Sequence, residues 1–252
     1  MRPRLGGMVG RSCAVFLALA LATGTMTPEL SLGPVAGALE ERVSAPKVKN
    51  DLIPYPKKRK RQMARYSKRH YGKRKWILSD PPVIVLHLTS GSSYRSAWNH
   101  FASNAPNRGE LPGVCAHFIV GKRGIIYRVV PTRIRCRHAI GLNHKSIGIE
   151  MVQEIGSGSH WAAKQVLKRR PQIRAALRLT AHLKDRFGIR LRNVIGHAMA
   201  NDSPFFKDRQ GWRNDHTDWL ARDVRRFRTR LRRFVSAPTH MVGPATKQSS
   251  AT

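Results

Sequence analysis

The stretch VIVLHLT, residues 83–89, places a histidine inside an apolar run that is rich in β-branched residues. Two prolines precede the run and Gly91 follows it, so we predict a buried strand bounded by turns. Alternate side chains of a strand share one face, which puts His87 on the same face as Val83 and Val85. A histidine in this position is either a hydrogen-bonded core residue or a ligand, and the strand alone leaves both interpretations open.

The stretch SIGIEMV, residues 146–152, is predicted to be a second strand. Its two isoleucines and Met151 alternate with Ser146, Gly148 and Glu150. The alternation assigns Glu150 to the face opposite the isoleucines. Its carboxylate is therefore either paired with one of the chain's many arginines or available for chemistry.

Helices and strands alternate along the rest of residues 79–235. Pro171 precedes a helix that Gly188 ends, and a final helix carries one apolar stripe among many arginines. The other predicted elements are a helix capped by Ser93, a hairpin formed by 116–120 and 125–130, and a short strand at 193–197. We predict an α/β fold with a mixed central β-sheet flanked by helices, in one domain.

Polar residues gather near the ends of two predicted strands. His87 lies in the first strand, and His197 follows the short strand VIG. A third cluster, NDHTDW at 214–219, precedes the final helix. Imidazole and carboxylate groups suit Zn²⁺, and three protein ligands leave a fourth coordination position for water. A zinc site at these strand ends is therefore one hypothesis, and an aspartate that only caps the final helix is the other.

The charge balance is strongly basic, with 47 Lys and Arg against 14 Asp and Glu and a formal net charge of +33. Hydrophobic residues make up 41% of the chain, which is enough for a packed domain and excludes wholesale disorder. Such a charge concentrates polyanions near the surface. Nucleic acid, anionic lipid and anionic cell-wall polymers all satisfy this requirement, so the charge alone selects no partner.

The N-terminus predicts export. Three arginines precede a short apolar run, AVFLALALA at 14–22, and small residues follow it. This arrangement is typical of a secretory signal, and the run is too short to span a bilayer stably. We assign residues 1–38 to a signal peptide and pro-region, which removes Cys13 from the exported chain. Cys115 and Cys136 remain, and in an oxidising compartment they form either one disulfide or two buried free thiols.

Basic and aromatic residues are interleaved between residues 39 and 78. KKRKR occupies 57–61, and Tyr66 and Tyr71 follow among further lysines and arginines. The segment is either a solvated linker or an arm that lies along an anionic polymer, with its aromatic rings stacked on sugars or bases. At the other end of the chain, residues 236–252 are predicted to be an unstructured tail.

Five stretches within residues 83–219 resemble the N-acetylmuramoyl-L-alanine amidase type 2 domain, which bacteriophage lysozyme-type amidases and peptidoglycan recognition proteins share. In chain order they are VIVLHLTSG, CAHFIVGKRGIIYRVVP, RHAIGLNHKSIGIE, NVIGHA and DHTDW. RHAIGLN followed by SIGIE is the most specific part. The run LIPYPKKRKRQMARYSKRHYGKRKW is also similar to the lead-in of exported actinobacterial members. The resemblance implies one catalytic domain over residues 79–235.

The resemblance implies a zinc centre. His87 matches the first zinc ligand of the family, and His197 matches the second. The third ligand is often an Asp or Cys two residues after a lysine, and here that pattern is His-Thr-Asp at 216–218. Asp218 is then the third ligand, and His216 stands where the family keeps a lysine that stabilises the transition state. In the alternative, His216 binds zinc, and Asp218 does not touch the metal but contacts one of its ligands.

The resemblance also implies the reaction, which is hydrolysis of the amide between the lactyl group of muramic acid and L-alanine in peptidoglycan. Glu150 matches the catalytic glutamate, which takes a proton from water and returns one to the leaving nitrogen. His216 and zinc would share the charge of the tetrahedral intermediate. Arg137, His138 and Asn143 fall where members of the family contact the muropeptide.

Two other functions compete with this interpretation. One is a peptidoglycan-binding module of the same fold without turnover, which the presence of the three ligand candidates and Glu150 disfavours. The other is a nucleic-acid-binding protein, which explains the charge but neither the export signal nor the polar clusters. We therefore predict a secreted or wall-associated monomer that binds peptidoglycan and not nucleic acid. It has no membrane span after signal cleavage, and its basic segment contacts anionic wall polymers.

Overall fold

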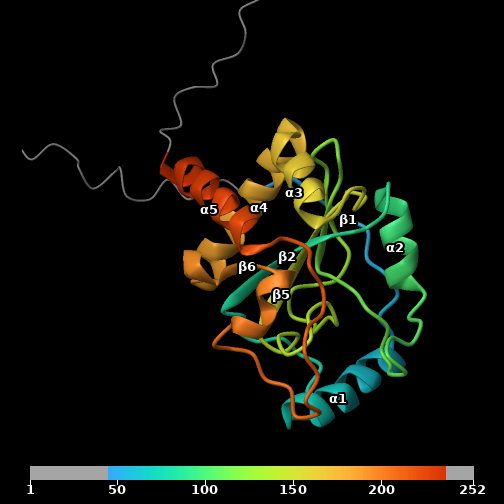
Figure 1. Cartoon of the computed structure of the whole chain (residues 1–252). Coiled ribbons are helices and arrows are strands. Elements are labelled where there is room, and N and C mark those ends of the chain that lie inside the picture. The colour runs from blue at the N-terminus through green and yellow to red at the C-terminus, as the bar shows by residue number, and fades with distance from the viewer. Residues whose placement is uncertain (1–44, 237–252) are drawn as a thin grey trace, which may run out of the picture. The chain divides into compact units, whose positions relative to one another are not determined.

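The computed structural model describes residues 45–236 of the chain (Figure 1). The predicted signal peptide and pro-region, residues 1–38, lie outside the described residues, and so does the predicted tail except for Ser236. Within the described part, no helix is both long enough and apolar enough to cross a membrane.

A six-stranded sheet in the order β1-β4-β3-β5-β2-β6 forms the centre of the domain. β3 and β4 pair antiparallel, as the predicted hairpin requires, and all other neighbouring strands pair parallel. The sheet is therefore mixed, and the predicted fold class is confirmed. The strands are β1 (Val48–Asn50), β2 (Val83–Leu88), β3 (Phe118–Val120), β4 (Ile126–Arg128), β5 (Ser146–Met151) and β6 (Val194–Gly196).

Five α-helices surround the sheet in the described residues. They are α1 (Lys57–Tyr71), α2 (Tyr94–Ala102), α3 (Ser159–Lys168), α4 (Arg170–Phe187) and α5 (Ala221–Ser236). Ser93 caps α2 by accepting a hydrogen bond from the backbone nitrogen of Ser96 at 3.1 Å, as predicted. Gly188 ends α4 in the left-handed conformation, also as predicted. The sequence did not predict α1, α3 or β1.

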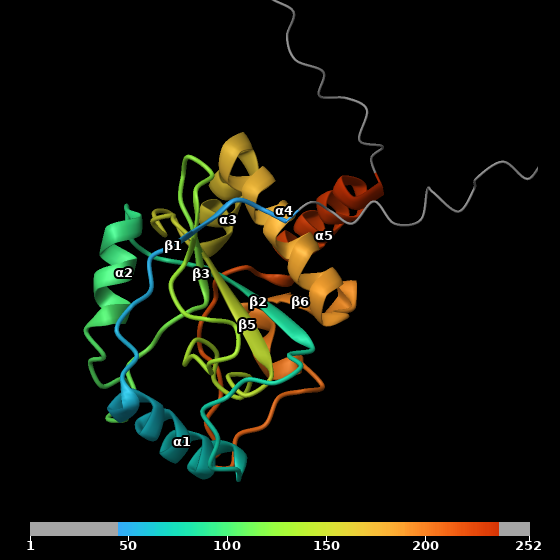
Figure 2. The ribbon, with the colours of Figure 1, turned by 180° about the vertical axis from the view of Figure 1, so that it is seen from behind.

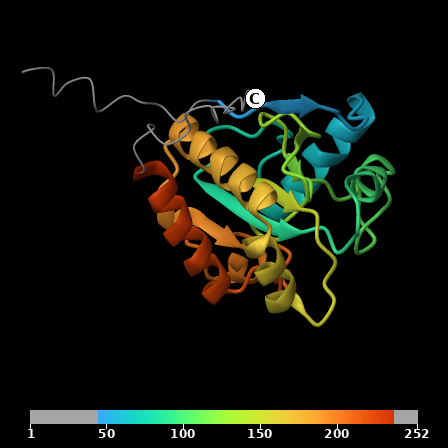
Figure 3. The same ribbon diagram turned by 90° about the horizontal axis from the view of Figure 1, so that it is seen from above.

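The largest hydrophobic core lies between the sheet and the three helices α3, α4 and α5. Ile84, Leu86 and Ile149 belong to this core, whereas Val83 and Val85 pack in a separate core on the other side of β2. Figure 3 shows α4 and α5 side by side on one side of the sheet, with α1 and α2 on the other. Figure 2 shows α1 at the end of the domain far from α3 and α5. Both faces of the sheet are therefore buried, as is usual for parallel strands.

The predicted strand faces are confirmed. Ile147 and Ile149 contribute to the core under α3, α4 and α5, so Glu150 lies on the opposite face of the sheet. His87 alternates with the core residues Leu86 and Leu88 in the same way. Both candidate residues therefore lie on the side of the sheet away from α4 and α5.

Cys115 and Cys136 form a disulfide, with their Cα atoms 5.2 Å apart. The alternative of two free thiols is therefore excluded by the structure. The bond joins the segment before β3 to the segment that carries Arg137 and His138, two residues predicted from the sequence to contact substrate.

Two interpretations were open for residues 39–78, a solvated linker and an arm whose aromatic rings stack on an anionic polymer, and both are wrong for the described part of that segment. Residues 57–71 form α1, and its Tyr66 and Tyr71 are only 0% and 5% exposed. These rings are packed inside the protein and are not free to stack on a polymer. The pattern concealed the helix because the buried face of α1 is largely polar, and lysines and arginines separate its few apolar residues.

The terminal nitrogens of Arg59, a buried residue of α1, bond to carbonyl groups in and after α2. Arg59 is 1% exposed, and its guanidinium donates to the carbonyl oxygen of Phe101 at 2.8 Å. The same group donates to the carbonyl oxygens of Gly113 and Val114 at 3.4 and 3.3 Å. A buried arginine is stable only with such partners, so α1 is built into the domain.

Candidate metal centre and active site

The parallel pairing of β5, β2 and β6 brings predicted site residues to one edge of the sheet. His87 of β2 is the register partner of Glu150 in β5. β6 pairs with β2 as far as Gly196, and His197 follows directly. The carboxyl ends of parallel strands meet at the same edge, so two histidines that are 110 positions apart become neighbours.

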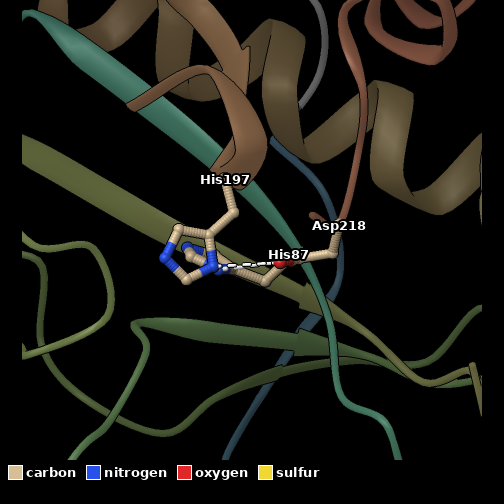
Figure 4. A group of neighbouring side chains, drawn as sticks. All are labelled: His87, His197 and Asp218. Carbon is tan, nitrogen blue, oxygen red and sulfur yellow. Dashed lines mark hydrogen bonds and ion pairs between the residues drawn. The ribbon is translucent and has the colours of Figure 1, made fainter. Parts of the chain in front are cut away.

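His87, His197 and Asp218 converge at this edge (Figure 4). Nδ1 of His197 lies 3.1 Å from Nδ1 of His87 and 3.1 Å from Oδ1 of Asp218. Nδ1 of His87 lies 3.7 Å from Oδ2 of Asp218. All three residues are buried, and one ligand atom of each lies within 4.8 Å of the others. Two imidazole nitrogens and a carboxylate oxygen suit Zn²⁺, whereas Mg²⁺ and Ca²⁺ prefer oxygen ligands alone.

Trp219 fixes the position of Asp218. Its ring is 0% exposed, and Nε1 donates to the carbonyl oxygen of His87 at 3.2 Å. The backbone nitrogen of Leu88 donates to Oδ2 of Asp218 at 3.1 Å. A Cβ atom at Gly196 would overlap the carbonyl oxygen of Trp219, so this approach requires glycine. Neither role was predicted from the sequence, although NVIGHA and DHTDW contain Gly196 and Trp219 next to the ligand candidates.

Glu150 has a buried carboxylate without a protein partner. The residue is 8% exposed, and within the described residues its Oε2 makes no hydrogen bond. Burial, and after it the negative charge of Asp218, together raise the pKa of Glu150 to about 8. The described chain holds no ion pair between Glu150 and an arginine, so the carboxylate is available to exchange a proton near neutral pH.

His216 lies at the rim of the cluster. Its ring stacks on that of His197, with centroids 4.2 Å apart and planes 15° apart. Partial burial, followed by the nearby His197, lowers the pKa of His216 below its usual 6.5. The ring is therefore mainly neutral at pH 7 and has one N–H to donate. Asn214 holds this segment by donating to the carbonyl oxygens of His197 and His216 at 3.0 and 3.2 Å.

His138 lies behind His87. Its Nδ1 is 3.0 Å from Nε2 of His87, and its Nε2 is 3.3 Å from the carbonyl oxygen of Ser146. Burial lowers the pKa of both rings well below the usual range, so both are neutral. A neutral His87 that points an unprotonated Nδ1 at the cluster donates from Nε2 to His138, which then donates to Ser146. Gly148 makes room for this chain, because a Cβ there would lie 2.8 Å from the ring of His138.

Arg137 and Asn143 line the cleft, but their polar atoms hold the protein together. Arg137 donates to the carbonyl oxygens of Glu110 and Pro112, each at 2.7 Å. Oδ1 of Asn143 accepts from the backbone nitrogen of His138 at 2.7 Å. The structure therefore places both residues in the wall of the site, and the substrate contact expected of them stays a prediction.

A cleft of about 710 Å³ opens above the cluster. Arg108 and Asp215, both in its lining, form an ion pair at 2.5 Å. The cleft is large enough for a ligand with several polar groups. Its lining includes Tyr66, His87, Ser96, His100, Phe101, Arg108, Arg137, His138, Asn143, Glu150, Ser159, His197, Asp215, His216 and Asp218.

The sequence profile of the N-acetylmuramoyl-L-alanine amidase family matches residues 78–218, which is more than half of the 252 residues. The chain belongs to this family. The part of the amidase-family chain that matches holds all three ligand candidates and Glu150, and it excludes α1 and α5. A comparison with curated proteins gave no match.

Solved structures of amidases are similar to this amidase-family chain at low identity. One is the endolysin N-acetylmuramoyl-L-alanine amidase LysCS from Clostridium intestinale, with 19% identity over 60% of this chain and 81% of that chain and a TM-score of 0.40. The PlyG catalytic domain has 13% identity over 78% and 99% of the two chains, with a TM-score of 0.45. The amidase AmiD from E. coli has 23% identity over 48% and 49%, with a TM-score of 0.37.

Proposed function

We propose that the protein is a zinc-dependent N-acetylmuramoyl-L-alanine amidase that cleaves the lactyl–L-alanine amide of peptidoglycan. The observation that carries this proposal is the convergence of His87, His197 and Asp218 beside Glu150, in the cleft of a chain that belongs to the family. The buried carboxylate oxygen of Glu150 without a partner also fits a site built around a cation and water. Zinc held by the three ligand candidates would act as a Lewis acid toward the amide carbonyl and toward water.

Asp218 is proposed as the third ligand in preference to His216. Both oxygens of Asp218 lie within 3.7 Å of an imidazole nitrogen of the two histidine ligands. His216 instead stacks its ring on that of His197, and it does not belong to the group of residues whose ligand atoms all lie within 4.8 Å of one another. Zinc content of Asp218→Ala and His216→Ala separates the two assignments, because only loss of the ligand should empty the site.

Glu150 is proposed as the group that moves the proton. Its carboxylate accepts a proton from the attacking water and delivers one to the nitrogen of the leaving alanine. A carboxyl group whose pKa lies near neutrality can do both at the same pH. No arginine or backbone donor competes for Oε2 within the described residues.

His216 is proposed to stabilise the oxygen that becomes negative during the reaction. Its neutral ring offers one N–H at the rim of the cleft, next to His197. Arg137 and Asn143 are proposed to shape the wall that holds the muropeptide, since their own hydrogen bonds fix the loops around it. His138 is proposed to orient His87.

Export through the N-terminal segment 1–38 remains part of the proposal. The disulfide between Cys115 and Cys136 supports it, because such bonds persist in oxidising compartments and are rare in reducing ones. Peptidoglycan also lies outside the cytoplasm for most of its existence. The size of the chain secreted from cells that express the full sequence would test this point, since removal of the segment shortens the product.

The activity is tested by incubating the full chain with purified sacculi and measuring newly released N-terminal alanine, together with zinc by mass spectrometry. We expect the wild type to hold zinc and release alanine. His87→Ala should lose both. Glu150→Gln should keep zinc and lose activity by about 10²- to 10⁴-fold. His182→Ala, on α4 and away from the site, serves as the matched control and should behave as the wild type.

If a folded, zinc-loaded protein released no alanine from sacculi, the proposed amidase activity would be contradicted. The remaining interpretation would be a peptidoglycan-binding module without turnover. Full activity after complete removal of metal would contradict the zinc assignment.

A further inference from the structure

The outer face of α5 carries a row of cations. The helix sequence ARDVRRFRTRLRRFVS contains seven arginines and one aspartate. That aspartate, Asp223, is buried and bonded to His160 at 2.6 Å, so it adds no negative charge to the outer face. The exposed arginines of the helix are Arg222, Arg225, Arg226, Arg230, Arg232 and Arg233.

The inner face of α5 packs against the core. Val224, Phe227 and Leu231 are each 0% exposed. A basic helix that lies in a membrane surface needs a free apolar face to insert among the lipids. Here that face is occupied, so the helix is suited to recognise charge alone.

The outer arginines have no acidic partner in the described residues. No salt bridge reaches them there, and Arg230 donates instead to the carbonyl oxygen of Leu167. Arg222 and Arg226, like Arg226 and Arg230, are four positions apart, a spacing at which like charges repel. This repulsion destabilises the free protein, and a bound polyanion would relieve it.

Two hollows on this side of the molecule are lined by the same kind of residue. One follows α5 and is lined by Arg222, Arg225, Arg226, Thr229, Arg230 and Arg233. The other lies at α4, and its charged residues are Lys47, Arg123, Arg174 and Arg178 from three chain segments. Neither lining contains an acidic residue. α4 packs against α5, so the two helices that contribute to these hollows lie in one layer (Figure 3).

This surface is separate from the catalytic cleft. α4 and α5 cover one side of the sheet, whereas His87 and Glu150 lie on the other. α5 also lies outside residues 78–218, the part that matches the family. A ligand on the outer arginines therefore does not occupy the site of reaction.

We propose that the outer faces of α4 and α5 bind an anionic polymer with phosphodiester linkages, of the kind attached to a cell wall, and so hold the protein on its substrate. The choice of a wall polymer rests on the proposed function. The phosphate preference follows from arginine, which binds phosphate oxygens through two parallel N–H groups. Single-stranded nucleic acid is disfavoured because aromatic rings that could stack on bases are missing from the exposed outer positions of α4 and α5. Duplex DNA, which proteins bind through its phosphates, is the competing outcome of the test.

The test compares two variants of equal net charge in the full chain. The first is Arg222→Gln, Arg225→Gln, Arg226→Gln and Arg233→Gln, which leaves Arg230 and its bond to Leu167 in place. The matched control changes Lys57, Lys58, Arg61 and Arg65 to Gln on the exposed face of α1. Glutamine keeps a high helix propensity in both. Co-sedimentation is measured over a range of salt concentrations, with sacculi that retain phosphodiester-linked polymers, with sacculi stripped of them by cold hydrofluoric acid, and with duplex DNA.

We expect the α5 variant to lose about ten-fold or more in affinity for polymer-bearing sacculi, with a shallower salt dependence. The control should change by about two-fold or less, and stripped sacculi should bind all three proteins alike. Equal losses in both variants, or no preference for polymer-bearing sacculi, would overturn the proposal. Tighter binding of the wild type to DNA than to the wall polymer would also overturn it and assign the surface to nucleic acid.

Cleavage of a soluble muropeptide keeps this test independent of the catalytic proposal. All three proteins should cleave it at the same rate, because the outer arginines lie across the sheet from Glu150. A wild type that fails to cleave it contradicts the proposed function, whereas the binding comparison still decides the role of α5.

Discussion

At the scale of single residues, His87 presents one ring nitrogen to the other two ligand candidates and the other nitrogen to His138, 3.0 Å away. A hydrogen bond of this kind fixes the tautomer and orientation of a metal-binding histidine. The expectation from the sequence was that His138 contacts substrate. That contact stays a prediction, since His138 lines the cleft, and the structure adds a hydrogen bond through which His138 can orient His87.

Replacing His138 by alanine should lower zinc affinity by about 10- to 100-fold, because His87 loses the acceptor that orients it. Competition with a chromogenic chelator measures this affinity without any need for turnover. His182→Ala on α4 is the control and should leave the affinity unchanged. A His138→Ala protein with unchanged zinc affinity and a higher KM would return His138 to the role of a substrate contact.

The raised pKa of Glu150 predicts an unusual dependence of stability on pH in the metal-free protein. The pKa of Glu150 is about 8 in the folded protein, whereas the usual value of 4.5 applies to the unfolded chain. Between pH 4.5 and 8 the folded state therefore binds more protons than the unfolded state. Stability from this group is therefore present below pH 4.5 and is lost as pH rises to 8. Each unit of pKa corresponds to about 1.4 kcal/mol, so the loss amounts to a few kcal/mol.

Urea unfolding in the presence of a chelator, at pH 5, 7 and 9, measures this effect against Glu150→Gln as reference. The free energy of unfolding of the wild type should fall relative to the variant as pH rises. Parallel pH curves for the two proteins would show that the carboxyl group is not perturbed.

At the scale of elements, α1 carries lysines and arginines on its exposed face, and one buried arginine anchors it to the domain. Arg59 is its buried anchor and reaches three carbonyl groups of the chain that forms one wall of the cleft. Tyr66 of the same helix lines the cleft itself. α1 lies outside the residues that match the family, yet it contributes directly to the shape of the site.

Arg59→Met should destabilise the protein by about 2–4 kcal/mol, because buried carbonyl groups lose their charged donor. Chemical denaturation midpoints measure the change. Arg61→Met, on the exposed face of the same helix, should stay within about 0.5 kcal/mol of the wild type. Equal effects of the two substitutions would mean that α1 is not anchored through Arg59.

At the scale of the whole molecule, buried histidines make the metal-free protein sensitive to acid. Burial lowers the pKa of His87 and His138 well below the usual range, and that of His117 from 6.5 to about 4. Below pH 6.5 the unfolded chain takes up protons at these three positions and the folded chain does not, so stability is lost as pH falls. Glu150 releases about one proton on unfolding in this pH range, which opposes the proton uptake by the histidines.

Burial also lowers the pKa of His144 from 6.5 to about 4, so the net uptake on unfolding is about three protons, which corresponds to a loss of about 4 kcal/mol for each pH unit below 6. Thermal unfolding from pH 6.5 to 4.5, with chelator present, should show a steep fall in Tm. His117→Gln should give a shallower fall whatever its stability at pH 7. A Tm that stays constant over this range would contradict neutral burial of the three rings.

The local pattern of the sequence was sufficient for much of the fold. Alternation assigned His87 and Glu150 to their strand faces, and Ser93 and Gly188 marked helix ends, because these features depend on neighbours within a few positions. The resemblance supplied the ligand candidates, whose spacing along the chain carries no signal of its own. α1 was missed because its buried face is polar and is satisfied only by distant carbonyl groups.

Sequence by itself thus determined the α/β class, the strand faces and the residue types of the site. Only the tertiary structure decided which of them meet, that His138 stands behind His87, and that α1 belongs to the cleft wall. The physical reason is that parallel pairing and buried hydrogen bonds join positions far apart in the chain. Periodicity reports only on neighbours a few residues away.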